Sequence, residues 1–363
     1  MLGRGGTNSS GIYIHIPFCV KKCSYCDFNS FDNIEHLYEP YTDALLAELA
    51  VRLPYDYDTV FIGGGTPTAL PLPLLLRAVG RVAKNGCEFT VEVNPATIDK
   101  EGFARLRAAG VNRISLGLQS ADDAELKTLG RIHDYSAFLN TYSAARGAGF
   151  DNINVDLMFS LPNQTADGFL RTLEKVVALS PEHLSCYSLI LEEGTPLFDA
   201  NPALPDEDED REMYVRCVDY LKKHGYEHYE ISNFSKPGFE CRHNLKYWNR
   251  DDYYGMGAGA HSLVGGVRYA NTTGVEEYIK GNNPSSEPLT AEDEEREFIF
   301  LGLRKTEGID LALYRALFGQ DFLQRRSRAA EKYRAFCEVE NGFFRLNLDG
   351  ISVSNVILSE LTE

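Results

Sequence analysis

The stretch IPFCVKKCSYCDF, from Ile16 to Phe28, places Cys19, Cys23 and Cys26 in the spacing C-x3-C-x2-C. Three cysteines cannot all pair as disulfides, and a tetrahedral zinc site takes four ligands. Thiolates that cluster in this way bind either zinc or an iron–sulfur cluster. Three thiolates can hold three irons of a [4Fe–4S] cluster, which leaves the fourth iron open to a small chelating ligand.

A zinc site is the alternative interpretation of the same three cysteines. Zinc would need Asp27, His15 or a distant residue as its fourth ligand. The spacing of the three cysteines favours the iron–sulfur cluster over zinc.

The cysteines follow the first of six short β-rich runs that alternate with amphipathic helical patterns. We expect strands at IYIHI (12–16), TVFIG (59–63), EFTVEV (88–93), RISLGLQ (113–119), NINVDLMF (152–159) and HLSCYSLI (183–190). Six strand–helix units in a row predict an α/β fold with a parallel sheet, for which an open doubly wound sheet and a partial barrel both fit.

Polar or glycine residues stand where these strands end. Cys19 follows the first strand, Gly64 and Gly65 the second, Glu92 closes the third and Gln119 the fourth. The segment IGGGTP (62–67) is neither a P-loop nor a GxGxxG site, but its bare N–H groups can approach a ligand closely. Functional residues gather at the carboxyl ends of parallel strands. We therefore expect one polar ligand to be contacted by the following residues: Glu92, Gln119, Arg131 and Asp156.

The pattern predicts four parts: a tail (1–10), the sheet unit (11–195), an extension (196–286) and a small C-terminal helical module with a β wing (287–363). In the extension we expect a helix at 212–224, a strand in YEHYEIS (226–232) and an irregular aromatic, Gly-rich segment at 243–266. In the last part we expect a helix from about Leu289 and a hairpin in GFFRLNLDGISVSN (342–355).

Composition narrows the class of protein. The chain has 363 residues and a formal net charge of −17, which argues against nucleic-acid binding and against anionic lipid, so membrane contact would be peripheral at most. The acid runs at 206–212 and 292–298 are expected to be solvated helix starts. The start of the chain has no apolar core before a cleavage site, and no apolar run is long enough to span a bilayer.

Five cysteines lie outside the cluster, without pair-like spacing: Cys87, Cys186, Cys217, Cys241 and Cys337. We expect most of them to be small buried apolar residues, and we assign them no function. Free cysteines and the absence of a secretory signal predict a cytoplasmic location.

These motifs, in this order, resemble the radical S-adenosylmethionine (SAM) superfamily. The segments YIHIPFC, FIGGGTP, VNRISLGLQS, LGRIH, DLMFSLPNQT, HLSCYSL and HNLKYWNRDDYYGMGAGAHS are similar to the HemN-like group, and most similar to the HemW haem chaperone family. The resemblance runs from Ile12 to His261, and the last hundred residues match loosely. It implies a partial (β/α)6 TIM-type barrel with a smaller C-terminal α+β domain.

The resemblance also implies the cofactors and their contacts. Cys19, Cys23 and Cys26 would ligate [4Fe–4S], and SAM would chelate the open iron. Tyr13 and Tyr25 match positions that flank the cluster and SAM, and Gly64, Gly65 and Thr66 match the segment that meets the methionine amino group and the adenosine. The remaining matches are Arg131 near the SAM carboxylate, Gln119 and Asp156 near the ribose, Glu92 as a further polar contact, and Ile190 beside the adenine.

Two features separate chaperone from oxidase within this group. The oxygen-independent coproporphyrinogen III oxidase has a fourth cysteine where this chain has Phe28, so the resemblance argues against that dehydrogenase activity while SAM cleavage stays open. The segment HNLKYW (243–248) matches H-N-x-x-Y-W, through which the HemW family is thought to bind haem. His243 would be the iron ligand, with Tyr247 and Trp248 on the porphyrin, and His261 is a weaker second candidate. Two alternatives stay open: His243 makes structural hydrogen bonds while the two aromatic residues belong to the core, or the segment binds a porphyrin without ligating iron.

The implied function is therefore haem binding and transfer to acceptor proteins. Haem would be the cargo, haem-accepting proteins the partners, and a homodimer is compatible with the family. The alternative is radical decarboxylation of coproporphyrinogen III to protoporphyrinogen IX. A non-redox zinc protein is the third hypothesis.

Overall fold

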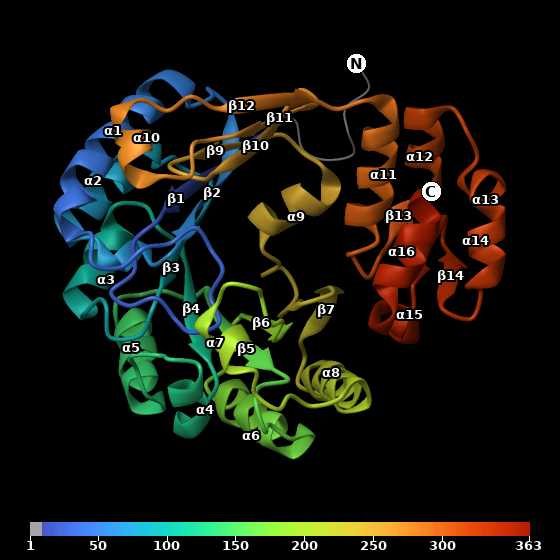
Figure 1. Ribbon diagram of the computed structural model, residues 1–363, viewed down its shortest axis with the longest axis horizontal. Helices are drawn as coiled ribbons and strands as arrows, with labels where there is room; N and C mark the ends of the chain where they lie inside the picture. Colours follow the sequence, from blue (N-terminus) through green and yellow to red (C-terminus); the bar gives the residue numbers. More distant parts are fainter. Residues whose placement is uncertain (1–8) are drawn as a thin grey trace.

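A twelve-stranded sheet dominates the computed structural model, which describes residues 9–363 (Figure 1). The predicted tail (1–10) lies mostly outside the described residues. Six strands run parallel in chain order and form the partial barrel: β1 (Ser10–Ile16), β2 (Tyr57–Gly64), β3 (Glu88–Val93), β4 (Arg113–Gln119), β5 (Ile153–Phe159) and β6 (His183–Ser188). The partial barrel is confirmed, and β3 and β4 have the predicted bounds, whereas β6 ends two residues before the predicted Ile190.

Helices cover the outside of these strands (Figure 1). Several begin at an Asp or Thr whose side chain accepts a backbone N–H of the first turn, as an N-cap does. They are η1 (Glu35–Leu37), α1 (Tyr38–Arg52), η2 (Pro67–Ala69), α2 (Leu72–Val82), α3 (Lys100–Ala108), α4 (Asp123–Thr128), α5 (Tyr135–Gly147) and α6 (Ala166–Val177). The helices carry the chain from the end of one strand back to the start of the next, as parallel strands require.

Alternation along the strands divides apolar from polar side chains. In β4, Ile114 and Leu116 are fully buried in the hydrophobic core, whereas Arg113 and Ser115 line a cavity on the other face. β5 repeats the pattern with Val155 in the core and other residues toward the same cavity. Because side chains of a strand alternate between faces, the outer face packs on helices and the inner face keeps its polar groups.

The segment after residue 195 adds strands to both edges of the barrel sheet. At one edge β8 (Asn233–Ser235) pairs antiparallel with β6, and β7 (Glu227–Glu230) pairs with β8. At the other edge β9 (Tyr253–Met256) pairs parallel with β1. The strands β10 (His261–Val264), β11 (Val267–Ala270) and β12 (Ser285–Pro288) follow in order beyond β9, antiparallel to one another.

The prediction of an irregular segment at 243–266 is wrong in detail. The segment contains all but the first residue of α9 (Arg242–Asn249), and the whole of β9 and β10. Its glycines serve turns between ordered elements, since Gly257 and Gly259 have φ values of 99° and 76°. The other helices of this part are α7 (Pro196–Ala200), α8 (Glu207–Lys223) and α10 (Val275–Lys280).

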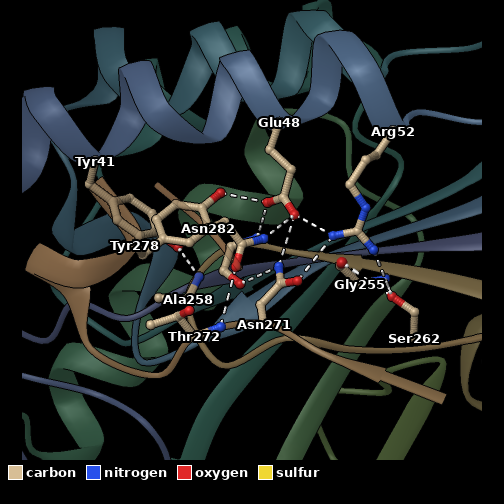
Figure 2. A network of polar contacts seen from close by, with 11 residues as sticks. Tyr41, Glu48, Arg52, Gly255, Ala258, Ser262, Asn271, Thr272, Tyr278 and Asn282 are labelled. Atoms are coloured by element: carbon tan, nitrogen blue, oxygen red, sulfur yellow. Dashed lines mark hydrogen bonds and ion pairs between the residues drawn. The ribbon is translucent and has the colours of Figure 1, made fainter. Parts of the chain in front are cut away.

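A buried carboxylate ties this extension to α1 (Figure 2). Glu48, whose side chain is 6% exposed, accepts hydrogen bonds from Tyr278 Oη at 2.5 Å and from Gly257 N at 2.9 Å. It also accepts from Asn271 and Asn282, each at 2.9 Å, and pairs with Arg52. Because every lone pair has a partner, the charge is tolerated inside the protein and fixes α10 and β9–β11 against the barrel.

The C-terminal part has its own small sheet, in the order β13-β15-β14 (Figure 1). Its elements are α11 (Ala291–Gly302), β13 (Ile309–Asp310), α12 (Leu311–Phe318), α13 (Phe322–Arg325), α14 (Ser327–Lys332), β14 (Cys337–Glu340), β15 (Phe343–Leu346), α15 (Leu348–Ser352) and α16 (Ser354–Thr362). The predicted domain borders at 195/196 and 286/287 stay predictions.

The predicted hairpin at 342–355 is misplaced. Its turn is at Asn341 and Gly342, which both have positive φ as a tight hairpin turn requires, so β15 pairs with the preceding β14. The residues after β15 are helical, because Asn347 Oδ1 accepts a hydrogen bond from Gly350 N and caps the start of α15.

Both acid runs begin helices, as predicted. Asp206 and Thr290 are N-caps with capping boxes for α8 and α11. Glu295 is the exception to their expected solvation, because it is buried and pairs with Arg325 and Arg326. One acid of the second run therefore holds the C-terminal part together.

Candidate functional site

The three clustered cysteines lie on residues 17–31, called the cysteine loop here, between β1 and η1. Backbone hydrogen bonds close the loop at its base, from Cys19 N to Phe31 O at 2.9 Å and from Phe31 N to Pro17 O at 2.8 Å. Further bonds fix its middle, from Ser24 N to Leu129 O at 3.1 Å and from Leu197 N to Ser24 O at 2.8 Å. The loop is therefore held by chain segments more than a hundred residues away.

The extension supports the far end of the cysteine loop. Asn29 Nδ2 donates to Ala258 O and to Thr273 O, both at 3.1 Å. A Cβ at Gly259 would lie 2.4 Å from Asn29 Nδ2, so this close approach requires glycine. The Glu48 network holds the same turn, through Gly257 N.

A cavity of about 360 Å³ opens at the carboxyl ends of the strands, and all three cysteines of the loop line it. We call it the cysteine cavity. Nine further residues predicted from the sequence line it as well: Tyr25, Gly64, Gly65, Thr66, Glu92, Gln119, Arg131, Asp156 and Ile190. The fold thus brings together residues from the cysteine loop and the strand ends, and their individual ligand contacts stay predictions.

The three thiols lie in one cavity, as ligands of a single iron–sulfur cluster must. Within residues 9–363, no three His, Cys, Asp or Glu side chains are close enough to hold one ion together. A [4Fe–4S] cluster requires no such convergence, since each thiolate binds a different iron. Burial is the main cause that raises the pKa of the Cys19 and Cys26 thiols, so cluster binding must displace their protons.

Two polar side chains contact the thiols directly. Arg131 Nη1 lies 3.4 Å from Cys23 Sγ, and Thr66 Oγ1 lies 3.8 Å from Cys19 Sγ. Arg131 also donates from Nη2 to Asn94 Oδ1 at 2.7 Å and to Gly117 O at 2.6 Å. Its guanidinium is therefore fixed beside the cysteine loop.

The glycines after β2 allow this strand end to meet the cysteine loop. Gly65 N donates to Ile16 O at 2.8 Å, and a Cβ at Gly65 would lie 2.6 Å from Phe18 O and 3.0 Å from Cys19 Sγ. Gly64 has a φ of 115° and donates its N–H to Glu92 Oε2 at 3.1 Å. A side chain at Gly65 would push on the residues that carry the first cysteine.

Glu92 is a half-buried acid with few partners. Burial, and then the nearby Asp156, raise its pKa to about 8. Within the described chain it accepts one hydrogen bond, from Gly64 N. A cationic amino group in the cysteine cavity would supply the missing partner, which fits the predicted contact with an amino-acid ligand.

Asp156 and Gln119 lie deeper along the strand ends. Asp156 accepts from Ser115 Oγ at 3.0 Å and from Asn154 Nδ2 at 2.8 Å, and burial is the main cause that raises its pKa. Gln119 has a φ of 73°, at the point where the register between β4 and β5 shifts. This strained backbone, unusual for a residue with a side chain, directs the end of β4 at the cavity.

Tyr13 is the predicted SAM-site residue that lies apart from this set. It lines a second space of about 200 Å³ inside the barrel, called the inner cavity, and its Oη lies 2.9 Å from His15 Nδ1. Both cavities are bordered by Glu92, Ser115, Asp156 and Tyr187. Tyr13 therefore stands beneath the cysteine cavity rather than in it.

The residues predicted to hold haem close the inner cavity. His243 and Tyr247 on α9 line it, and His243 is 1% exposed. His243 Nδ1 lies 2.9 Å from Thr59 Oγ1, and its Nε2 lies 2.9 Å from Tyr247 Oη. Burial lowers the pKa of His243 to about 3. Ligation of haem iron by His243 would require breaking at least one of these hydrogen bonds.

The other aromatic and histidine candidates lie elsewhere. Trp248 stacks against Arg304, whose guanidinium carbon is 4.5 Å from the ring centroid, and so contacts the segment after α11. His261 is exposed at the start of β10. The structure thus separates His243 from Trp248 and His261, and the haem roles of all four residues stay predictions.

Sequence reasoning missed several residues of the cysteine cavity. Asn94 follows β3 directly, and its Nδ2 donates to Thr66 Oγ1 at 2.6 Å while its Oδ1 accepts from Arg131. Its position at the end of a predicted strand could have identified it as a site residue, as the same position did for Glu92. Ser115 and Tyr187 point inward by strand alternation, which is predictable only once the inner face is known.

The five scattered cysteines mostly behave as predicted. Cys87, Cys186, Cys217 and Cys241 are buried, while Cys337 is half-buried. All eight cysteines are free thiols. Along residues 9–363 no helix is both long and apolar enough to cross a bilayer.

Comparisons with known proteins agree with this site. The model of the radical SAM superfamily matches residues 13–176, and that of the HemN C-terminal domain matches residues 289–353. The second match corrects the loose resemblance expected for the last hundred residues. The E. coli coproporphyrinogen III oxidase HemN, described as a radical SAM enzyme, is structurally similar with a TM-score of 0.85 over 99% of this chain and 92% of that chain, at 22% identity, which shows the shared fold.

Curated relatives are more similar in sequence. The heme chaperone HemW of Bacillus subtilis is 39% identical over 328 residues, covering 85% of this chain and 86% of that protein. HemW of Escherichia coli is 40% identical over 70% of each chain, and HemW of Mycobacterium tuberculosis is 33% identical over 92% of this chain and 87% of its own length. The chain therefore belongs to the HemW family of the radical SAM superfamily.

Proposed function

We propose that this protein is a haem chaperone that carries a [4Fe–4S] cluster and SAM, binds haem and delivers it to acceptor proteins. The observation that supports the proposal best is the identity of 39% to a protein named heme chaperone HemW across 86% of its length. The cysteine cavity adds chemical support, since its three thiols leave room for a fourth ligand on the cluster.

In this proposal Cys19, Cys23 and Cys26 hold the cluster, and the strand ends hold SAM. When bound and reduced, the cluster supplies an electron that cleaves the sulfonium of SAM. The Arg131 guanidinium, fixed on Asn94 and Gly117, is placed to neutralise a carboxylate beside Cys23. Glu92 takes the amino group, and the half-buried Asp156 accepts hydroxyl donors.

The remaining expectations complete the proposal. Free thiols at the cluster site suit a reducing compartment, so we place the protein in the cytoplasm. Haem-accepting proteins are its partners, and a homodimer is its proposed assembly. The HNxxYW histidine, His243, would reach haem iron only after it leaves Thr59 or Tyr247.

Anaerobic reconstitution tests this function. The protein is purified without oxygen, and iron, sulfide, SAM binding, haem uptake and haem release to a haem-free acceptor protein are measured on one preparation. We expect about four irons and four sulfides per chain, a haem-dependent Soret band, and transfer of that band to the acceptor. Zinc without sulfide, or haem that never leaves the protein, would contradict the proposal.

The same preparation distinguishes the chaperone from the oxidase. Coproporphyrinogen III is supplied with SAM and a reductant, and protoporphyrinogen IX is sought after anaerobic incubation. We expect none, because Phe28 stands where the oxidase group has a fourth cysteine. The variant Phe28→Cys tests whether that single difference blocks the reaction.

A further inference from the structure

Large apolar side chains gather at the mouth of the cysteine cavity. Phe28, Ile190 and Tyr187 all line it, yet they are 63%, 68% and 40% exposed. Phe28 belongs to the cysteine loop, whereas Tyr187 and Ile190 belong to the end of β6 and the residues after it. Single exposed apolar residues are ordinary, but a group of them at one opening marks a binding surface.

The apolar surface continues beside this opening. A small hollow next to the cysteine cavity has Val20 and Ile132 in its lining, which are 55% and 50% exposed. The rest of its lining is Lys21, Cys23, Arg131 and the uncharged polar residues Thr66, Asn94 and Thr97. Lys21 also lines the mouth of the cysteine cavity. The apolar side chains therefore surround the outer side of the cysteine loop, with an exposed ammonium group among them.

The charges at the mouth favour an anionic group on one side. Lys21 and Arg131 line both hollows, while Asp27 and Glu192 line the cysteine cavity alone. The Arg131 guanidinium is already engaged by Asn94 and Gly117, so Lys21 is the exposed cation at the opening. In a chain with a formal net charge of −17, a dianionic ligand is repelled except near a local cation. The neighbouring Lys22 is less available, because its Nζ donates to Phe28 O at 3.0 Å.

The size of the cysteine cavity decides where a large flat ligand can lie. At about 360 Å³ it is near the lower limit of pockets that enclose one small molecule. Haem, a broad apolar disc with two propionates, cannot share that space with another ligand. It can lie across the opening, where the exposed aromatic and aliphatic side chains would be covered.

We propose that haem docks across the mouth of the cysteine cavity, with its porphyrin face on Phe28 and Ile190 and its propionates toward Lys21. This inference rests on the proposed haem chaperone function and assigns the site for the cargo. It requires no iron ligand from α9, where His243 is buried with both ring nitrogens engaged. Bound haem would also cover the exit of any molecule in the cavity.

Haem and iron-free protoporphyrin IX distinguish this site from ligation by His243. Each is titrated into the reconstituted protein with SAM present, by absorbance and by fluorescence quenching of the protein. Because the contacts are to the porphyrin face and the propionates, we expect the two affinities to agree within about fivefold. Binding of haem alone would overturn the proposed site and favour an iron ligand.

Variants at the mouth provide the second test. Phe28→Ser and Ile190→Ser should each weaken porphyrin binding by roughly fivefold or more, as the loss of a central apolar contact does. Lys21→Glu should weaken it and remove much of its salt dependence. Tyr55→Ser is the matched control, because Tyr55 is a fully exposed aromatic residue outside both hollows. Unchanged affinity in Phe28→Ser and Ile190→Ser would overturn the site.

The third test measures release from the cavity. Labelled SAM is bound to the reconstituted protein and chased with unlabelled SAM, with and without haem. We expect haem to slow release of the label several-fold in the wild type and not in Phe28→Ser, whereas equal rates in the wild type would contradict the docking. If the wild type binds neither haem nor protoporphyrin, the proposed function itself fails. If it binds haem but the mouth variants behave as wild type, only the site fails.

Discussion

Gly65 offers a sharp test of how the second strand positions the cysteine loop. A Cβ at this position would lie 2.6 Å from Phe18 O and 3.0 Å from Cys19 Sγ. The first neighbour is backbone and cannot rotate away, so Gly65→Ala must displace the chain just before the first cysteine. Overpacking of this kind costs about 1–3 kcal/mol.

The entropy of the unfolded chain offsets part of this cost. Replacing Gly by Ala stabilises a protein by about 0.4–1 kcal/mol where the site accepts the methyl group. We therefore expect Gly65→Ala to lower the free energy of unfolding by roughly 1–2 kcal/mol net. The displacement should also lower cluster content, because Thr66 N is bound to Phe18 O at 2.7 Å and Thr66 lies against Cys19.

Gly80→Ala is the matched control. Gly80 lies within α2, and a Cβ there would meet no atom within 4 Å. We expect this variant to be more stable by about 0.5–1 kcal/mol, as for Gly to Ala in a helix. Urea unfolding of the cluster-free proteins, with iron and sulfide content after reconstitution, measures both effects. A Gly65→Ala protein with the wild-type midpoint and full iron content would refute the reasoning.

Four further predictions follow from individual contacts. Cys23→Ser should lose the cluster, measured as iron and sulfide per chain, whereas Cys337→Ser should keep it. His243→Ala in the cluster-free protein should lower the free energy of unfolding by about 2–4 kcal/mol, because two buried hydrogen bonds and a buried ring are lost; a change under about 0.5 kcal/mol would show that α9 does not depend on it. Glu48→Ala should cost about 3–5 kcal/mol in urea unfolding, since it leaves buried donors without an acceptor and removes the carboxylate that pairs with Arg52. Because the pKa of Glu92 is raised to about 8 in the folded protein, the unfolded state binds fewer protons than the folded state between about pH 4.5 and 8, and stability should fall across this window as pH rises; Glu92→Gln should flatten that fall, and a parallel slope in the variant would contradict the assignment.

If haem lies across the mouth of the cysteine cavity and SAM lies inside it, the two ligands would occupy one continuous site. Phe28 is the residue at which they meet, since it belongs to the cysteine loop and is exposed at the opening. The resemblance to the HemN-like group implies a cysteine at this position in the oxidase. In this interpretation, an apolar side chain at Phe28 replaces a thiol and provides a surface for the porphyrin.

The sequence alone determined the cysteine spacing and the bounds of the third and fourth strands. C-x3-C-x2-C is a local pattern, and the third and fourth strands could be bounded because apolar alternation is also local. Glu92, Gln119 and Asp156 could be grouped without a structure, because the carboxyl ends of parallel strands meet at one edge of the sheet.

Only the tertiary structure shows which face of the sheet the other site residues occupy and which segments cover the sheet edges. The segment after residue 195 pairs with β1 at one edge and β6 at the other, and no local pattern encodes partners so distant in the chain. His243 illustrates the consequence: its sequence motif suggests an open ligand, but Thr59, 184 residues away, engages its ring. Burial and hydrogen-bond satisfaction are properties of the packed fold, so the motif alone could not show that this ring is buried and engaged.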